Sequence, residues 1–346
     1  MLGSLAEGVT RVSGFLEGED SLATLEAFRR MGVAIEPHGD NRWTVSGVGM
    51  HGLRAADSAL DLGNSGTGMR LMSGLLAAQA FDSVLVGDES LMQRPMLRVA
   101  RPLNAMGASV ETDCGRPPLR IGGNCELVAI DYSMPVASAQ VKSSLLLAGM
   151  YAEGETCVSE PAPTRDHTER MLRGFGYQVE SEGNRVCLEG GGKLTATDID
   201  VPADISSAAF FLVGASIAEN ADLTIRHVGM NPTRSGIINI LRAMGADIEV
   251  LNESLVGGEP VADLRVRSAQ LKGIRIPESQ VPLAIDEFPV LFVAAACAQG
   301  ETVLTGAEEL RVKESDRIQV MADGLQALGI DATPTPDGMV IRNGDI

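Results

Sequence analysis

Cysteine and long apolar runs are scarce in this 346-residue chain. The five cysteines lie far apart, with no CxxC pair and no metal-ligand spacing, so we expect reduced thiols. The longest apolar runs, at residues 210–218 and 290–298, are too short for the roughly 18–20 residues of a membrane span. These features favour a cytoplasmic protein that has no membrane partner.

Signatures of metal and nucleotide cofactors are also missing. The four histidines show no ligand spacing, and neither an HExxH motif nor a P-loop GK[ST] motif occurs. Residues 47–52 (GVGMHG) fit the pattern GxGxxG, but no apolar helix follows them, so they do not indicate a dinucleotide site. The formal net charge of −18 argues against nucleic acid as a partner. We therefore expect no metal, no cofactor and no nucleic acid.

The basic residues are outnumbered but clustered, at positions 94–101 and 311–317. Lys313 and Arg317 are four residues apart, which predicts a shared helix face with Glu314 beside them. Arginine and lysine bind carboxylate and phosphate groups, and a carboxylate between two cations can exchange protons with a substrate. A solvated surface ladder of ion pairs is the alternative interpretation.

A helix that ends in an apolar residue followed by glycine recurs along the chain. The glycines are Gly32, Gly107, Gly176, Gly245 and Gly329. Glycine suits this position because it enters the left-handed region freely and closes the helix. The spacings of 75, 69, 69 and 84 residues exceed those of solenoid repeats and indicate repeated small α/β units.

A second repeating pattern is an apolar helix, a turn and a β-branched strand. Such helices are expected to be buried because they are apolar on most faces. We place their starts near Thr67, Val141, Ser206 and Glu287, and we expect these starts to face a common cleft. Backbone N–H groups at a helix start attract phosphate or carboxylate. The alternative is that Asn64, Ser65, Asp204 and Asp286 are ordinary N-caps.

The motifs together resemble the 5-enolpyruvylshikimate-3-phosphate synthases. The matching segments are 62–67 (LGNSGT), 87–96, 137–143 (ASAQVKS), 164–171 (TRDHTERM), 202–208, 231–234, 285–289 (IDEFP) and 311–317. The resemblance implies an α/β (α+β) fold of two domains built from βαβαββ units, with the active site in the cleft between them. It implies a first domain at 1–201 and a second, incomplete domain at 202–346.

The resemblance also implies the reaction and the residues that carry it. The enolpyruvyl group of phosphoenolpyruvate is transferred to the 5-hydroxyl of shikimate 3-phosphate by a monomer that needs no cofactor. The implied catalytic residues are Asp286, which deprotonates the 5-hydroxyl, and Glu314, which moves protons at the methylene carbon. The implied phosphoenolpyruvate-binding residues are Gly66, Arg94, Gln140 and Arg317. The implied shikimate 3-phosphate-binding residues are Ser138, Ala139, Gln140, Arg165, Asp286 and Lys313. Because both substrates are anions, we expect a positive cleft lined by Arg94, Lys142, Arg165, Lys313 and Arg317.

Two other functions are alternatives to the synthase. A UDP-N-acetylglucosamine enolpyruvyl transferase would share the fold and the donor, but its loop cysteine has no counterpart at 87–95. A non-catalytic fragment is the other alternative. The repeat pattern predicts that the chain begins inside a helix and lacks a sixth repeat, and the terminal basic motifs of the family are absent.

Overall fold

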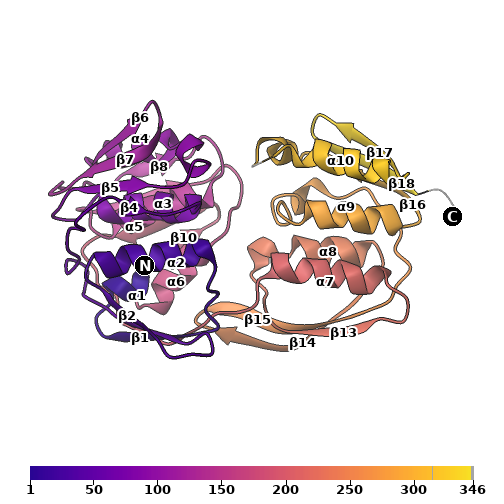
Figure 1. Cartoon of the computed structure of the whole chain (residues 1–346), viewed down its shortest axis with the longest axis horizontal. Helices are drawn as coiled ribbons and strands as arrows, with labels where there is room; N and C mark the ends of the chain where they lie inside the picture. The colour runs from indigo at the N-terminus through magenta and orange to yellow at the C-terminus, as the bar shows by residue number, and fades with distance from the viewer. Residues whose placement is uncertain (314, 344–346) are drawn as a thin grey trace. The chain divides into compact units, whose positions relative to one another are not determined.

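The structure is a computed structural model that describes residues 1–313 and 315–343. The chain divides into two compact units, unit 1 (Met1–Val201) and unit 2 (from Pro202). Figure 1 labels the helices and strands and colours unit 1 from indigo to pink and unit 2 from salmon to yellow. Glu314, which the sequence analysis assigned a catalytic role, lies outside the described residues.

The strands of unit 1 form four-stranded sheets that mix parallel and antiparallel pairs. They are β1 (Val9–Ser13), β2 (Ala34–Pro37), β3 (Trp43–Ser46), β4 (Leu60–Asp61), β5 (Ser83–Val86), β6 (Ser109–Asp113), β7 (Arg116–Gly122), β8 (Asp131–Ser133), β9 (Glu155–Ser159), β10 (Glu180–Glu182), β11 (Arg185–Glu189) and β12 (Ile199–Asp200). The strand orders are β12-β1-β3-β2, β4-β5-β7-β6 and β8-β9-β11-β10.

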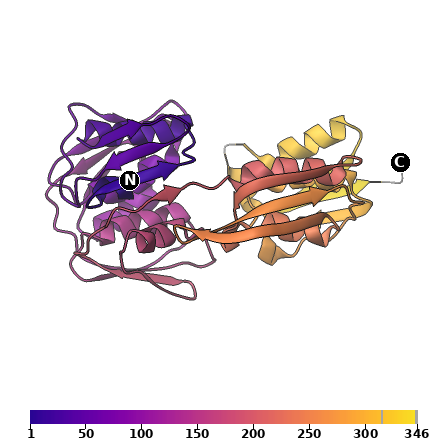
Figure 2. The ribbon, with the colours of Figure 1, turned by 90° about the horizontal axis from the view of Figure 1, so that it is seen from below.

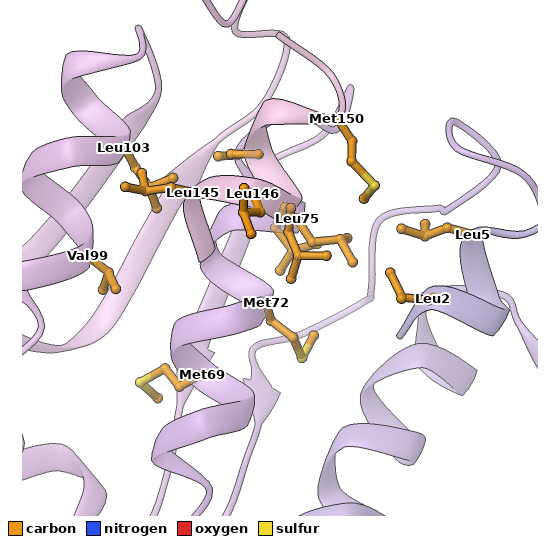
Figure 3. Packing of buried hydrophobic residues seen from close by; sticks show 14 of the residues in the cluster. Leu2, Leu5, Met69, Met72, Leu75, Val99, Leu103, Leu145, Leu146 and Met150 are labelled. Atoms are coloured by element: carbon orange, nitrogen blue, oxygen red, sulfur yellow. The ribbon is translucent and has the colours of Figure 1, made fainter. Parts of the chain in front are cut away.

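The helices of unit 1 alternate between apolar and amphipathic. They are α1 (Leu2–Leu5), α2 (Glu19–Arg30), α3 (Gly66–Leu76), α4 (Leu97–Ala105), α5 (Ala139–Gly149) and α6 (His167–Gly174), with a 3-10 turn η1 (Leu91–Gln93). The apolar helices α3 and α5 pack against each other, and the core of unit 1 lies around them. Figure 3 shows Leu75 of α3 beside Leu146 of α5.

Unit 2 contains two three-stranded sheets within the described part of the chain. The strands are β13 (Asp222–Gly229), β14 (Asp247–Val256), β15 (Glu259–Arg267), β16 (Gly300–Leu304), β17 (Asp331–Thr335) and β18 (Gly338–Asn343). The helices are α7 (Ile205–Ile217), α8 (Gly236–Ala243), α9 (Phe288–Cys297) and α10 (Arg317–Ala327), with 3-10 turns η2 (Pro232–Arg234), η3 (Glu278–Gln280) and η4 (Glu308–Val312). Figure 2 shows the long antiparallel strands β13, β14 and β15, in salmon to orange, lying along the helices of this unit.

The glycine-ended helices of the sequence analysis are α2, α4, α6, α8 and α10. The glycine that follows each has a positive φ, between 82° and 95°. Its N–H bonds back to a carbonyl of the last helical turn, as that of Gly32 does to Arg29 at 2.9 Å. The predicted role of these glycines as helix terminators is therefore confirmed.

The apolar helix α7 departs from its expected burial. Phe210 is 66% exposed and Phe211 61% exposed, and Val293 of α9 is 38% exposed. The expectation failed because a helix that is apolar all round can bury only the faces that neighbouring elements cover. None of the helices in residues 1–313 and 315–343 combines the length and the apolar character that a membrane span requires.

The expectation of five reduced thiols is also wrong in this structure. Cys157 of β9 and Cys187 of β11 are joined by a disulfide. The two residues are direct partners across an antiparallel strand pair, and the N–H of Cys157 donates to Ile130 instead of β11. Side chains approach most closely at such non-hydrogen-bonded positions. The pairing depends on strand register, so the spacing of the cysteines in the sequence gave no sign of it.

Candidate active site

The start of α3 presents a glycine to two guanidinium groups. Ser65 caps the helix, and its hydroxyl accepts a hydrogen bond from the N–H of Gly68 at 3.1 Å. A Cβ built on Gly66 would lie 2.8 Å from Nη1 of Arg94 and 3.2 Å from Nη1 of Arg70. The positive end of the helix therefore lies beside two cations, which suits an anionic ligand.

Arg94 is held by the loop that follows β5. It lies at the end of η1 and donates a hydrogen bond to Oδ1 of Asn64. Asn64 in turn donates to Asp88 over 2.6 Å, and the N–H of Leu91 donates to the same carboxylate over 2.7 Å. The hydrogen bond from Leu91, with that from Asn64, holds the pKa of Asp88 below its ordinary value. An ionised Asp88 thus orients Asn64, and Asn64 orients Arg94.

Arg70 is a member of this site to which the sequence analysis gave no role. Arg70 is 5% exposed. Its guanidinium group donates to Oε1 of Gln140 over 2.6 Å and to the carbonyl of Pro95 over 3.4 Å. Burial, followed by the nearby Arg98 and Arg94, lowers the pKa of Arg70 to about 10. The side chain therefore stays cationic at neutral pH. The sequence could have indicated this role, because Arg70 is four residues after Gly66 and therefore on the same helix face.

The start of α5 adjoins the start of α3. Ser138 caps α5 by accepting from the N–H of Val141 at 3.4 Å, and Ala139 and Gln140 are the first helical residues. Gln140 donates through Nε2 to the hydroxyl of Thr67 over 2.7 Å. Gln140 therefore links the two helix starts. Gly66, Arg94 and Gln140, predicted to bind the same ligand, are brought together in unit 1.

Arg165 and Lys142 of the same unit have different environments. Arg165 is half-buried in the loop before α6. Lys142, which we expected to line a positive cleft, is 1% exposed and forms ion pairs with Glu160 and Glu169. That expectation is wrong, because two carboxylates distant in the sequence draw the ammonium group into the interior.

Unit 2 groups a carboxylate with two cations at the start of α9. Arg317 donates to Oδ1 of Asp286 over 3.2 Å, and Nζ of Lys313 lies 4.0 Å from the same oxygen. Lys313 also donates to Glu309 over 2.7 Å. The predicted common helix face for Lys313 and Arg317 is wrong, because Asp316 caps α10 and the helix begins only at Arg317. The loop still brings both cations to Asp286.

A second polar network joins the starts of α7 and α9. Asp204 caps α7, and Arg234 contacts it at 2.8 Å. Arg234 also donates to Ser206 over 2.5 Å, and Ser206 donates to the buried Glu287. Burial raises the pKa of Asp204, but Arg234 and the hydrogen bonds from Ser207 outweigh it and lower the pKa overall. Asp286 itself is not an N-cap, since Glu287 occupies that position.

Metal-ligand side chains gather at one place among the described residues. Glu155, Cys157 and Cys187 lie within reach of a single ion, but the two cysteines are bonded to each other. This group is apart in the sequence from the helix starts that carry the candidate site.

Comparison with known proteins agrees with the motifs. The family model described as "EPSP synthase (3-phosphoshikimate 1-carboxyvinyltransferase)" matches residues 1–346. The chain belongs to the EPSP synthase family. The chain is 71% identical, over 99% of its length and 79% of the relative's, to a 3-phosphoshikimate 1-carboxyvinyltransferase of Methylococcus capsulatus. The relative of that name from Alkalilimnicola ehrlichii is also 71% identical, over 99% of this chain and 77% of its own.

Solved structures of EPSP synthases have the same fold. A structure of EPSP synthase from Acinetobacter baumannii, at 63% identity, superposes with a TM-score of 0.93 over 100% of this chain and 78% of its own. The predicted α/β enolpyruvyl transferase fold is thereby confirmed. EPSP synthases transfer the enolpyruvyl group in the shikimate pathway, so the predicted reaction class is confirmed as well. The comparisons do not favour the non-catalytic fragment.

Proposed function

We propose that the helix starts of unit 1 bind phosphoenolpyruvate and shikimate 3-phosphate, and that unit 2 supplies the catalytic carboxylate. The observation that carries this proposal is the convergence of Arg94 and Arg70 on the glycine that opens α3. Two guanidinium groups beside the positive end of a helix match the phosphate and carboxylate of phosphoenolpyruvate. Gln140 and, from unit 2, Arg317 complete the proposed phosphoenolpyruvate-binding set with Gly66 and Arg94.

The proposed shikimate 3-phosphate site uses hydroxyl, amide and cationic groups. Ser138, Ala139, Gln140 and Arg165 of unit 1 are its members, with Asp286 and Lys313 of unit 2. A helix start with a nearby arginine suits the 3-phosphate group. Lys313 supplies a further point charge for the substrate.

The reaction needs proton transfers that Asp286 can serve. The 5-hydroxyl oxygen bonds to C2 of phosphoenolpyruvate while C3 gains a proton, and the adduct then loses a proton from C3 as the C2–O bond to phosphate breaks. We assign the removal of the 5-hydroxyl proton to Asp286 and proton movement at C3 to Glu314. Arg317 and Lys313 beside Asp286 favour its ionised form, which a general base requires.

Alanine substitutions test the assignment of the cations. Arg94→Ala and Lys313→Ala should each lower kcat/KM at least about 30-fold, which corresponds to about 2 kcal/mol of transition-state stabilisation. Phosphate release from the two substrates is the readout. Arg185→Ala is the matched control, because Arg185 is an exposed arginine paired with Asp131 at 2.8 Å. Unchanged kinetics in both test variants would contradict the proposal.

We also make proposals on the domain boundaries, the cellular location and the oligomeric state of the protein. We infer that the domains are 1–201 and 202–346, which the division between Val201 and Pro202 supports. Three of the glycine-ended helices lie in unit 1 and two among the described residues of unit 2, which agrees with three repeats followed by about two. We also propose a cytoplasmic monomer, and light scattering that gives the mass of one chain would check the second point.

A further inference from the structure

We propose that the buried Lys142 is a positioning residue that fixes the loop carrying Arg165 against the start of α5. The inference rests on the proposed function, in which Arg165 and the residues at the start of α5 bind shikimate 3-phosphate. Lys142 itself is 1% exposed and does not reach a ligand at the surface. Any effect on substrate binding must therefore pass through its neighbours.

Lys142 contacts two carboxylates that are as buried as it is. Its Nζ donates to Oε1 of Glu160 over 3.0 Å and lies 2.7 Å from Oε1 of Glu169. The side chains of the two glutamates are 7% and 2% exposed. Both carboxylate oxygens of Glu169 are buried without a hydrogen-bond partner among the described residues, so the ion pair with Lys142 is the contact that stabilises this charge. Lys142 thus contacts both glutamates, and its single positive charge offsets one of their two negative charges.

The two glutamates bracket the loop on which Arg165 lies. Glu160 directly follows β9, and Glu169 lies in the first turn of α6. Glu160 also accepts a hydrogen bond from the hydroxyl of Thr164 over 2.5 Å, which fixes the residue next to Arg165. A single ammonium group on α5 therefore holds both ends of this loop.

A second polar contact joins α5 and α6. Ser143, the neighbour of Lys142, shares a hydrogen bond of 2.7 Å with Thr168 on α6. Because α5 is anchored in the core by its leucines, its position does not depend on these polar contacts. The loop before α6, in contrast, meets α5 through the charged cluster.

Removal of the Lys142 charge should move the loop and leave the core in place. Two buried carboxylates without a cation are strongly disfavoured, and they regain hydration only if the loop shifts outward. The position of Arg165 would then change, and binding of shikimate 3-phosphate would weaken. Binding of phosphoenolpyruvate at Gly66 and Arg94 should change much less, because neither residue lies on the loop.

Calorimetric titration with shikimate 3-phosphate tests the inference on the full chain. Lys142→Met keeps a long aliphatic side chain without charge, and its Kd should rise at least tenfold. Lys142→Arg keeps a cation that can contact both carboxylates, so its Kd should rise less. Lys193→Met is the matched control and should leave Kd unchanged, because Lys193 is an exposed lysine paired with Glu7 at 3.4 Å.

Steady-state kinetics provide a readout that a general loss of stability would not give. In Lys142→Met we expect KM for shikimate 3-phosphate to rise at least tenfold, with kcat at saturation within about threefold of the unchanged chain. An equal fall in kcat with unchanged KM would overturn the positioning role.

Two further variants keep the inference falsifiable. If Lys142→Met does not fold, the triple variant Lys142→Met, Glu160→Gln, Glu169→Gln removes all three charges and should fold while still binding shikimate 3-phosphate at least tenfold more weakly. Unchanged binding by the folded variant would overturn the inference. The variant Arg165→Gln tests the proposed role of Arg165 separately from the positioning role of Lys142. If it weakens binding and the Lys142 variants do not, only the positioning role fails; if none weakens binding, the proposed role of Arg165 fails too.

Discussion

Arg317 donates a hydrogen bond to Asp286 across 3.2 Å, from the first residue of α10 to the residue before the N-cap of α9. Lys313 lies 4.0 Å from the same carboxylate oxygen. Two cations beside one carboxylate stabilise its ionised form. Asp286, which we propose as the base, thus lies beside two cations that can also hold an anion.

Asp286→Asn keeps the shape of the side chain and removes its basicity. We expect kcat to fall by about 10²–10⁴, the usual range for loss of a general base, with a smaller change in KM. Phosphate release at saturating concentrations of both substrates measures it. Asp323→Asn is the control, because Asp323 is an exposed residue of α10 that contacts Gln319 at 2.7 Å. If Asp286→Asn kept at least a third of the kcat of the unchanged chain, Asp286 would not be the general base.

Gly66→Ala should displace Arg94 without unfolding the chain. The new methyl group would lie 2.8 Å from Nη1 of Arg94, and that flexible guanidinium can move aside. We expect KM for phosphoenolpyruvate to rise about tenfold, because the displaced cation no longer meets the anion at the helix start. Gly324→Ala in α10 is the control, since its Cβ meets nothing within 4 Å and alanine favours the helix. Equal KM values in the two variants would contradict the assignment.

The ion pair of Asp204 and Arg234 predicts how stability changes in acid. The pKa of Asp204 is lowered from 3.8 in the folded chain, so the folded state binds fewer protons than the unfolded state. The ionised Asp204 contributes fully to the free energy of unfolding above about pH 4. This contribution is lost as the pH falls through the lowered pKa. Urea unfolding of Asp204→Asn at a series of pH values should show a flatter acid limb than the unchanged chain. Asp198→Asn, at an exposed aspartate 3.5 Å from Arg11, should leave the acid limb unchanged.

Local features of the fold could be predicted from the sequence. The glycines that end the amphipathic helices act within one turn, and Ser65, Ser138 and Asp204 cap helices through groups three residues away. Such contacts depend only on neighbours in the chain, so residue type and spacing reveal them. The starts of the apolar helices were accordingly placed within two residues of their observed positions.

Features that depend on distant partners could not be predicted. Arg70 meets Gln140 across 70 positions, and Lys142 meets Glu160 across 18, so neither contact follows from local periodicity. Lys142 was expected to line a positive cleft, and a buried charge without a partner would be costly. Only the fold shows that two glutamates pair with it. The same limit applies to Cys157 and Cys187, whose contact depends on the register of β9 with β11.

The Cys157–Cys187 disulfide should stabilise the chain measurably. A bond that closes a loop across 30 positions restricts the unfolded chain by about 3–4 kcal/mol in the loop-entropy model. Dithiothreitol should therefore lower the urea midpoint of the unchanged chain, and the double variant Cys157→Ala, Cys187→Ala should show no such response. Cys125→Ala, at a half-buried free cysteine, should respond as the unchanged chain does. Thiol titration of the denatured, unreduced chain should detect only Cys114, Cys125 and Cys297. Five reactive thiols and a midpoint insensitive to dithiothreitol would show that the pair is reduced under those conditions.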